Sequence, residues 1–203
     1  MARKVLFYNA KGGQGKTTLA AHFALYSDSH FYTNEYKIGT EDLYKDVLTQ
    51  NGRKPERFNI IAGQDERLVV EDRAVFDFGG SLDGKIPAVA RACDLCVIPI
   101  HYQSKAELRS LFIMLSALAE YNRHILIVIN NTETAFIPSL EAGLIKETPY
   151  PVKVIRHSAF MTYLANEGLT PFQLNEQIKG APRKALVTIQ NQLRELFKFI
   201  EEY

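Results

Sequence analysis

The densest group of glycine, lysine and threonine residues lies near the start of the chain. It consists of Lys11, Gly12, Gly13, Gln14, Gly15, Lys16, Thr17 and Thr18. Glycines let backbone N–H groups turn inward around an anion, and the N-terminus of a following helix adds its dipole. In such a loop Lys16 would reach the β- and γ-phosphates, Thr17 would hold Mg²⁺ through its hydroxyl, and Thr18 would bond the α-phosphate. The group therefore predicts a site for ATP or ADP with Mg²⁺.

A carboxylate that could complete this metal site ends a later apolar run. Asp77 lies near the end of the segment Ala74–Phe78, and Gly79 and Gly80 follow it. An acid at the tip of a strand can orient a Mg²⁺-bound water, and the two glycines would let the next loop approach the γ-phosphate. The alternative is an aspartate that only caps a turn. With the glycine-rich loop upstream, we predict that Asp77 belongs to the metal site.

Short apolar segments alternate with helical patterns along the chain, which is typical of a parallel sheet covered by helices. The expected strands are Val5–Tyr8, His30–Thr33, Ala74–Phe78, Cys96–Ile100, Ile125–Ile129 and Val152–Ile155. The expected long helices run from Lys16 to about Tyr26, from Ser104 to about Tyr121, and from Arg183 to near the C-terminus. Between Lys37 and Val70 we expect a short helix around Glu41–Thr49 and a strand or turn near Phe58–Ala62. The pattern predicts a single doubly wound α/β domain over residues 1–203.

The composition is that of an ordinary globular protein and excludes several classes. The 203 residues are 46% hydrophobic and carry a net charge of +1, so a nucleic-acid site would need a local basic patch. Two cysteines do not form a disulfide framework in a chain of this length. The N-terminal apolar run is too short for a signal peptide, and no stretch is long enough to span a membrane. We expect a cytoplasmic protein.

The glycine-rich loop departs from the common phosphate-loop pattern in a specific way. Ala10 stands where the first glycine belongs, and Lys11 is an additional lysine. This variant resembles the deviant Walker A loop of the ParA/MinD family of ATPases, and the segment around Asp94–Pro99 resembles a later strand of that family. The order and spacing of the motifs are most similar to short plasmid-partition ParA proteins. The resemblance implies an ATP-bound sandwich homodimer in which Lys11 reaches across to the phosphates of the other subunit.

One position differs from the family pattern and affects the expected activity. After its second strand the family usually carries an aspartate that positions the attacking water, and Asn34 stands at the corresponding place. An amide can orient water but cannot accept its proton. Glu35 is the nearest carboxylate, and Glu35 or Asp42 could substitute. We therefore expect a weak ATPase with slow hydrolysis.

Other polar residues follow the later strands of the expected sheet. Asn130 follows Ile125–Ile129, and Arg156 follows Val152–Ile155. By resemblance to the family these positions would flank the nucleotide base, although Asn130 could instead form a turn and Arg156 could face DNA. Cys93 and Cys96 could supply half of a metal site shared across a dimer, but buried cysteines more often pack as small hydrophobic residues.

The C-terminal quarter carries a net positive charge, whereas the rest of the chain is net negative. Residues 146–198 contain eight lysines and arginines and four glutamates, a net charge of +4. This could be an ordinary solvated surface, but the resemblance to DNA-coating partition ATPases favours a DNA contact through Lys179, Arg183 and Lys184. The last helix also carries Glu195 and ends in Glu201 and Glu202, which disfavours a membrane surface.

Taken with the resemblance, these features predict a ParA-like partition ATPase that segregates plasmid or chromosomal DNA. Its ATP-bound dimer would associate with the nucleoid by binding DNA non-specifically, and a ParB-like centromere-binding adaptor would stimulate hydrolysis. The first alternative is a MinD-like or cargo-positioning ATPase that acts on a protein complex. The second is a nucleotide-dependent scaffold with little turnover.

Overall fold

The computed structural model describes residues 4–34, 40–61, 71–80, 84–174, 178 and 180–203. Its strands form one seven-stranded sheet in the order β3-β2-β4-β1-β5-β6-β7, and all neighbouring strands pair in parallel. The strands are β1 (Lys4–Asn9), β2 (His30–Thr33), β3 (Phe58–Ile60), β4 (Ala74–Gly79), β5 (Leu95–Ile100), β6 (Ile125–Asn130) and β7 (Val152–Ile155). The predicted doubly wound α/β class is confirmed.

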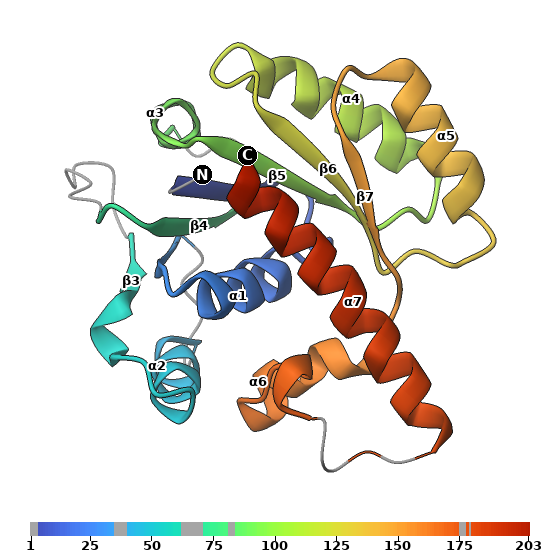
Figure 1. Cartoon of the computed structure of the whole chain (residues 1–203). Coiled ribbons are helices and arrows are strands. Elements are labelled where there is room, and N and C mark those ends of the chain that lie inside the picture. The colour runs from blue at the N-terminus through green and yellow to red at the C-terminus, as the bar shows by residue number, and fades with distance from the viewer. Residues whose placement is uncertain (1–3, 35–39, 62–70, 81–83, 175–177, 179) are drawn as a thin grey trace.

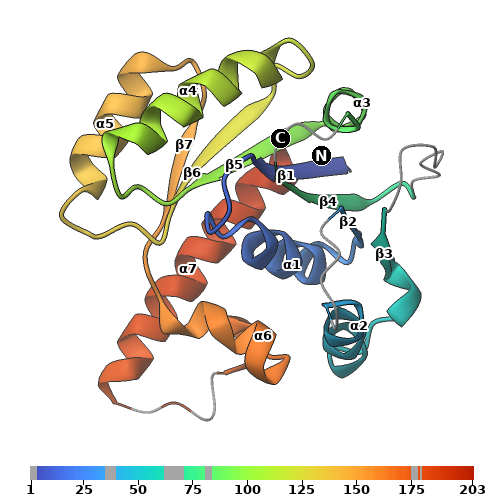
Figure 2. The same ribbon diagram turned by 180° about the vertical axis from the view of Figure 1, so that it is seen from behind.

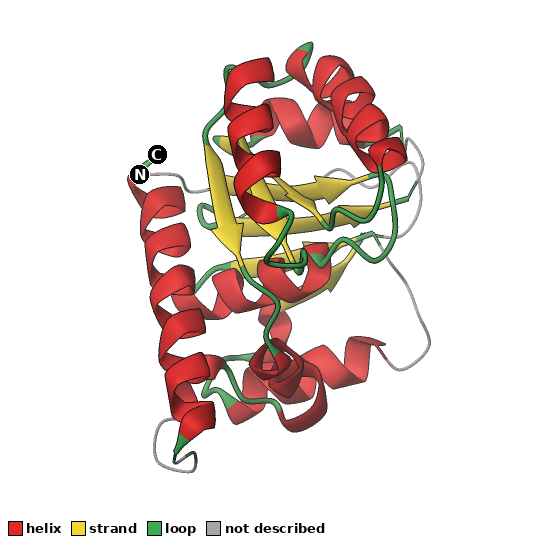
Figure 3. Ribbon diagram, turned by 90° about the vertical axis from the view of Figure 1, so that its right-hand side faces the viewer, coloured by secondary structure: helices red, strands yellow, loops and turns green. Residues whose placement is uncertain are grey.

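Helices cover both faces of the sheet (Figures 1 and 2). One face carries α1 (Lys16–Ser27), α2 (Thr40–Gln50), α6 (Tyr163–Glu167) and α7 (Ala181–Glu202). The other face carries α3 (Ile86–Ala92), α4 (Lys105–Ala119) and α5 (Ile137–Glu147). Figure 3 shows the strands lying between these two layers.

The central strands are largely apolar because both of their faces are buried. In β1 the side chains of Val5 and Phe7 join the core beneath α1 and α7, whereas Leu6 and Tyr8 join the core beneath α3 and α4. Every residue of β4, β5 and β6 is buried. Such strands show a continuous hydrophobic run rather than an alternating one, and this is why their positions could be predicted from sequence.

The central strand β1 marks the point where the chain changes direction across the sheet. The chain first builds β2, β3 and β4 on one side of β1 and then places β5, β6 and β7 on the other side. In open parallel sheets, ligands bind in the crevice at the carboxyl ends of the strands at such a point. The glycine-rich loop follows β1 and therefore lies in this crevice.

Three helices were absent from the sequence-based prediction. Short helices α3 and α6 span 7 and 5 residues, which is too short for a helical hydrophobic period to stand out. The 11-residue α5 buries only Ile137, Leu140 and Leu144 among its described side chains. The predicted short helix before β3 is confirmed as α2, and the strand near Phe58 is confirmed as β3.

Candidate functional site

The glycine-rich loop connects β1 to α1 and has the backbone conformation of an anion cradle. Gly13 and Gly15 have φ values of 75° and 80°, which side-chain-bearing residues rarely adopt. Gly15 also has no room for a side chain, because a Cβ there would lie 2.1 Å from the Asn130 Nδ2 atom. Lys16 begins α1, and its residue is only 4% exposed. A lysine is seldom buried this deeply unless its charge is used.

Amide side chains hold the loop on the neighbouring strand ends. Asn9, the last residue of β1, donates from Nδ2 to the Pro99 carbonyl at 2.8 Å and accepts the Lys11 backbone N–H at 2.9 Å. The Asn130 Nδ2 atom donates to the Gln14 carbonyl at 3.0 Å. These bonds tie the loop to the ends of β1 and β6, and the end of β1 to β5.

Gln14 fixes the other side of the loop through its own side chain. Its Oε1 atom accepts the His101 backbone N–H at 2.7 Å, and Gln14 is only 4% exposed. The sequence pattern places Gln14 in the loop as a residue of any type and assigns no role to Asn9. From sequence, Asn9 could have been identified only as a polar residue directly after the expected strand Val5–Tyr8.

A cavity of about 570 Å³ opens beside the loop. Its lining includes Gly13, Gly15 and Thr18 from the loop and the first turn of α1, together with Asn130 and Arg156. The structure thus brings both residues predicted to flank the base to the same cavity as the loop. Asn130 has a structural role that sequence could not indicate, since its amide holds the loop. Thr17 lies in the same first helical turn and is partly exposed.

Asn131 and His157 form a further polar pair at the edge of this cavity. The His157 Nδ1 atom and the Asn131 Oδ1 atom are hydrogen-bonded, and both residues line the cavity. Asn131 has a positive φ of 53°, a conformation that asparagine adopts more readily than most residues. The pair was not predicted.

Asp77 lies in β4, immediately beside the strand that leads into the loop. Its Cα pairs with that of Phe7 in β1 and with that of Thr33 in β2, and its side chain is fully buried. A buried carboxylate is costly unless a cation or hydrogen bonds compensate its charge. Asp77 and Thr17 offer the oxygen ligands that Mg²⁺ prefers, so the residues present fit this ion.

Asn34 does not face the site as a free amide but holds the loop after Asp77. Its Oδ1 atom accepts the Gly79 N–H at 3.0 Å, and its Nδ2 atom donates to the Gly79 carbonyl at 3.2 Å. Both functional groups of the side chain are therefore bonded to one residue at the end of β4. Glu35 and the Asp42 side chain, the two candidate substitutes for the usual aspartate, lie outside the described residues.

Lys11 lies at the exposed tip of the loop, and its side chain is bonded within the chain. The Lys11 Nζ atom is 2.5 Å from the Glu107 Oε1 atom at the start of α4. Glu107 was not identified from sequence as a site residue. Ser104 followed three residues later by Glu107 is a capping-box pattern, which would have located the helix start but not this ion pair.

Cys93 and Cys96 are packed as part of the core. Both are free and buried. Burial raises the pKa of Cys96 to about 12 and that of Cys93 well above its ordinary value, so neither is a ready thiolate ligand. Among the described residues, no group of three or more histidine, cysteine and acidic side chains could hold a metal ion.

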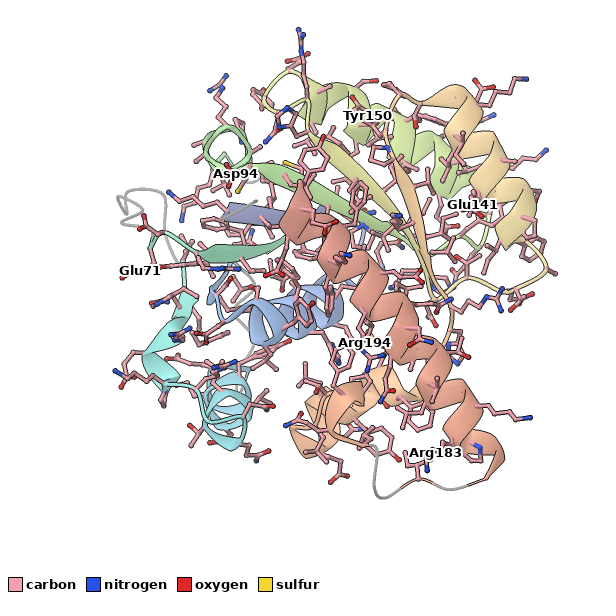
Figure 4. The ribbon with its side chains drawn as sticks, in the orientation of Figure 1. Glu71, Asp94, Glu141, Tyr150, Arg183 and Arg194 are labelled. Carbon is pink, nitrogen blue, oxygen red and sulfur yellow. The ribbon has the colours of Figure 1, made fainter. Side chains whose placement is uncertain are left out.

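Two of the three basic residues predicted to contact DNA lie at the N-terminal end of α7. Arg183 and Lys184 are exposed there, and Figure 4 shows Arg183 at that end and Arg194 farther along the helix. Lys179 lies outside the described residues. The opposite face of α7 is fully packed, with Leu186, Leu193 and Phe197 all at 0% exposure.

The fold is similar to that of several solved ATPases. A protein described as a plasmid partition protein from Borrelia burgdorferi, bound to AMPPNP, aligns over 98% of this chain and 100% of its own with a TM-score of 0.63 and 14% identity. A chain of the MinC:MinD cell division protein complex of Aquifex aeolicus aligns over 97% of this chain and 96% of its own with a TM-score of 0.65 and 14% identity. A ParA family ATPase from Chlorobium tepidum aligns over 95% and 99% with a TM-score of 0.57 and 20% identity.

These likenesses show that the chain has the ParA/MinD-type fold, as the resemblance in sequence had predicted. The sequence itself matches no protein-family model and no curated protein. In the part of the chain that the structure describes, no helix combines the length and apolar character needed to cross a bilayer.

Proposed function

We propose that this chain, which has the fold of ParA/MinD-type ATPases, is an ATP-dependent switch of the partition type. The observation that carries the proposal is the loop itself. It is held in an anion-binding conformation by Asn9, Gln14 and Asn130 and opens into a 570 Å³ cavity of suitable size for a nucleotide. Pre-ordered backbone donors of this kind reduce the entropic cost of binding.

The residues around the loop have separable roles in this proposal. Lys16 and the loop N–H groups neutralise the phosphates, while Thr17 and Asp77 hold Mg²⁺, which would screen the charge that develops during phosphoryl transfer. Asn130 and Arg156 lie beside the base or sugar. Lys11 supplies additional positive charge to the phosphates of a second copy, so that a homodimer is the active form.

Hydrolysis is expected to be slow because Asn34 stands where the family usually carries an aspartate. The Asn34 amide cannot act as a base, and its Oδ1 and Nδ2 atoms are both hydrogen-bonded to the backbone of Gly79. A slow intrinsic rate of hydrolysis suits a switch whose ATP-bound and ADP-bound states bind another molecule with different affinity. That molecule, or an adaptor protein, can then determine when ATP is hydrolysed. We propose non-specific DNA as that molecule and a ParB-like adaptor as the stimulating partner.

Direct nucleotide binding tests this proposal first. Wild-type protein should bind a fluorescent ATP analogue with Mg²⁺. Lys16→Ala should bind it at least tenfold more weakly, because the variant has no buried ammonium group to bond the phosphates. Lys198→Ala, an exposed substitution on α7, serves as the control and should bind normally. Equal affinity of wild type and Lys16→Ala would exclude the loop as the nucleotide site.

A second candidate function is favoured by the position of Asn34. If the amide only holds the end of β4, the protein could work as a nucleotide-dependent scaffold with little turnover. Measuring phosphate release with and without DNA and adaptor separates the two functions. A cargo-positioning ATPase would bind nucleotide and hydrolyse it but would show no affinity for DNA.

A further inference from the structure

A cavity of about 120 Å³ lies beside α1, apart from the larger cavity at the glycine-rich loop. The two cavities share no lining residue. The small cavity is formed by three segments that are distant in sequence, namely α1, the connection after α2 and the turn after α6. Its lining includes His22, Asn51, Arg53, Thr170 and Phe172. Because most of these side chains are polar, the cavity is suited to a polar occupant.

His22 contributes a buried nitrogen atom that has no protein partner. The residue is 1% exposed, and its Nδ1 atom lies 2.7 Å from the Thr18 carbonyl oxygen one turn earlier in α1. A carbonyl oxygen only accepts hydrogen bonds, so Nδ1 carries the hydrogen and Nε2 of the neutral ring has a lone pair. Among the residues that the structure describes, no group bonds Nε2, which is itself buried. Because Nδ1 is bonded to α1, Nε2 is the polar atom that the ring offers to the cavity.

Arg53 and Thr170 supply the complementary groups. The Arg53 guanidinium is ion-paired with Asp28 at 2.9 Å and donates to the Leu25 carbonyl at 3.4 Å. A guanidinium has five N–H donors, so these two bonds leave others for an occupant of the cavity. Thr170 is buried, and its hydroxyl donates to the Gln173 Oε1 atom at 2.8 Å, so its oxygen can still accept a hydrogen bond. The lining therefore offers both donors and acceptors.

These groups disfavour an ion as the occupant. Burial lowers the pKa of His22 to about 4, so the ring is neutral at physiological pH and Nε2 has no hydrogen to donate to an anion. A cation would lie beside the Arg53 guanidinium, and the lining residues include no carboxylate. The lining thus fits a neutral molecule that both donates and accepts hydrogen bonds, and water has both functions. The cavity is large enough, since a buried water needs roughly 10–15 Å³ of such space.

We propose that this cavity is a hydration site in which one water molecule donates a hydrogen bond to His22 Nε2, accepts one from Arg53 and donates its second hydrogen to the Thr170 oxygen. About three hydrogen bonds are usual for a buried water. The water joins α1, the helix that begins at Lys16, to the segments that follow α2 and α6. The inference does not involve nucleotide binding, so its test is independent of the proposed function.

NMR of the protein labelled with ¹⁵N at histidine tests the site directly. We expect long-range ¹H–¹⁵N spectra to show a hydrogen on Nδ1 of His22 and none on Nε2. We also expect a cross-peak between water and the ring hydrogen Hδ2, with the sign of a long-lived contact. Hδ2 lies next to Nε2 and far from Nδ1, so hydrogen exchange at Nδ1 does not produce this signal. His124, whose ring is exposed, is the control and should show only short-lived water contacts.

Two arginine variants test the partner of the water. Arg53→Met removes the donor and should abolish the His22 cross-peak. Arg57→Met is the matched control, because Arg57 also pairs with Asp28, at 2.7 Å, but does not line the cavity. The control should keep the cross-peak. Any other pattern in the two variants overturns the proposal, since the signal would then not depend on Arg53 itself.

The wild-type spectrum decides the question even if a variant does not fold. A hydrogen on Nε2, or a bare Nε2 without a long-lived water contact, overturns the hydration site. If Arg53→Met is unfolded, Thr170→Val replaces it as the variant, because valine has nearly the same shape and no oxygen. Thr170→Val should weaken the His22 cross-peak, and an unchanged cross-peak would overturn the three-partner arrangement.

Discussion

At the scale of single residues, Gly15 is the position where the candidate site is most constrained. The backbone there has a φ of 80°, and the Asn130 amide occupies the space that a Cβ would need. Two independent conditions, one conformational and one steric, therefore require glycine. Gly12 lies in the same loop but meets nothing within 4 Å and has no positive φ, so it provides a matched comparison.

We predict that Gly15→Ala lowers the free energy of unfolding by about 1–3 kcal/mol, because alanine is strained at this φ and overlaps Asn130. Gly12→Ala should change it by less than about 0.5 kcal/mol. Urea unfolding of both variants without nucleotide checks this, so that effects on ATP binding do not enter. Equal destabilisation by the two substitutions would contradict the packing of Asn130 against the loop.

At the scale of elements, α1 carries a buried histidine directly below the loop. His22 is 1% exposed, and its Nδ1 atom bonds the Thr18 carbonyl one turn earlier. Burial lowers the pKa of His22 to about 4, although the hydrogen bond to Thr18 partly opposes this. Arg53 lines the same small cavity of about 120 Å³, and its guanidinium group is ion-paired with Asp28 at 2.9 Å. The neutral imidazole is therefore the form compatible with the packed helix.

Because burial keeps His22 neutral in the folded chain, we predict that protonation of His22 lowers the free energy of unfolding in acid. The unfolded chain protonates His22 near pH 6.5 and the folded chain only near pH 4, so the unfolded state binds more protons between these values. The contribution of neutral, buried His22 to the free energy of unfolding is fully present above about pH 6.5. It is lost as the pH falls to 4, a difference on the order of 3 kcal/mol.

His22→Gln removes the titrating group and keeps a neutral donor for the Thr18 carbonyl. Unfolding free energies measured from pH 7 to pH 4 should fall more steeply for wild type than for this variant. Other titrating groups cancel in the comparison because both proteins share them. Parallel pH profiles would show that the imidazole is not buried in its neutral form.

At the scale of the whole molecule, α7 distinguishes a DNA surface from a membrane surface. Most of its large apolar side chains pack into the core and are not available to a bilayer, although Val187 is 42% exposed. Its outward face carries Arg183, Lys184 and Arg194. A dimer would double these charges, and phosphate contacts add across both subunits.

We predict that Arg183→Gln/Lys184→Gln weakens ATP-dependent binding to random-sequence duplex DNA. The salt dependence, plotted as the logarithm of affinity against the logarithm of salt concentration, should become shallower by about one for each phosphate that the variant no longer binds. Lys198→Gln on the same helix is the control, since Lys198 lies 3.6 Å from Glu202 and its charge is already compensated. Unchanged DNA affinity in the double variant would place the DNA surface elsewhere, and no DNA binding in any nucleotide state would favour the cargo-positioning alternative.

Much of the fold and the centre of the site could be predicted from sequence because the signals are local. Buried parallel strands appear as continuous apolar runs, and the loop from Lys11 to Thr18 carries its backbone requirements in its glycines. The place of Asp77 in an apolar strand followed from the same local pattern, although β4 continues two residues beyond it, to Gly79. The short helices α3 and α6 were missed because one or two turns contain too few residues to show a period.

Long-range partners could be decided only by the tertiary structure. Asn130 holds the Gln14 carbonyl 116 residues away, Asn34 holds Gly79 across 45 residues, and Lys11 pairs with Glu107 across 96. The type of a side chain limits which hydrogen bonds and ion pairs it can form. Its actual partner depends on the order of the strands, because that order decides which strand ends are neighbours. The sequence by itself thus determined the α/β class and the glycine-dependent backbone of the loop. The packing of β1 between β4 and β5 decided which residues brace the loop and which carboxylate receives Lys11.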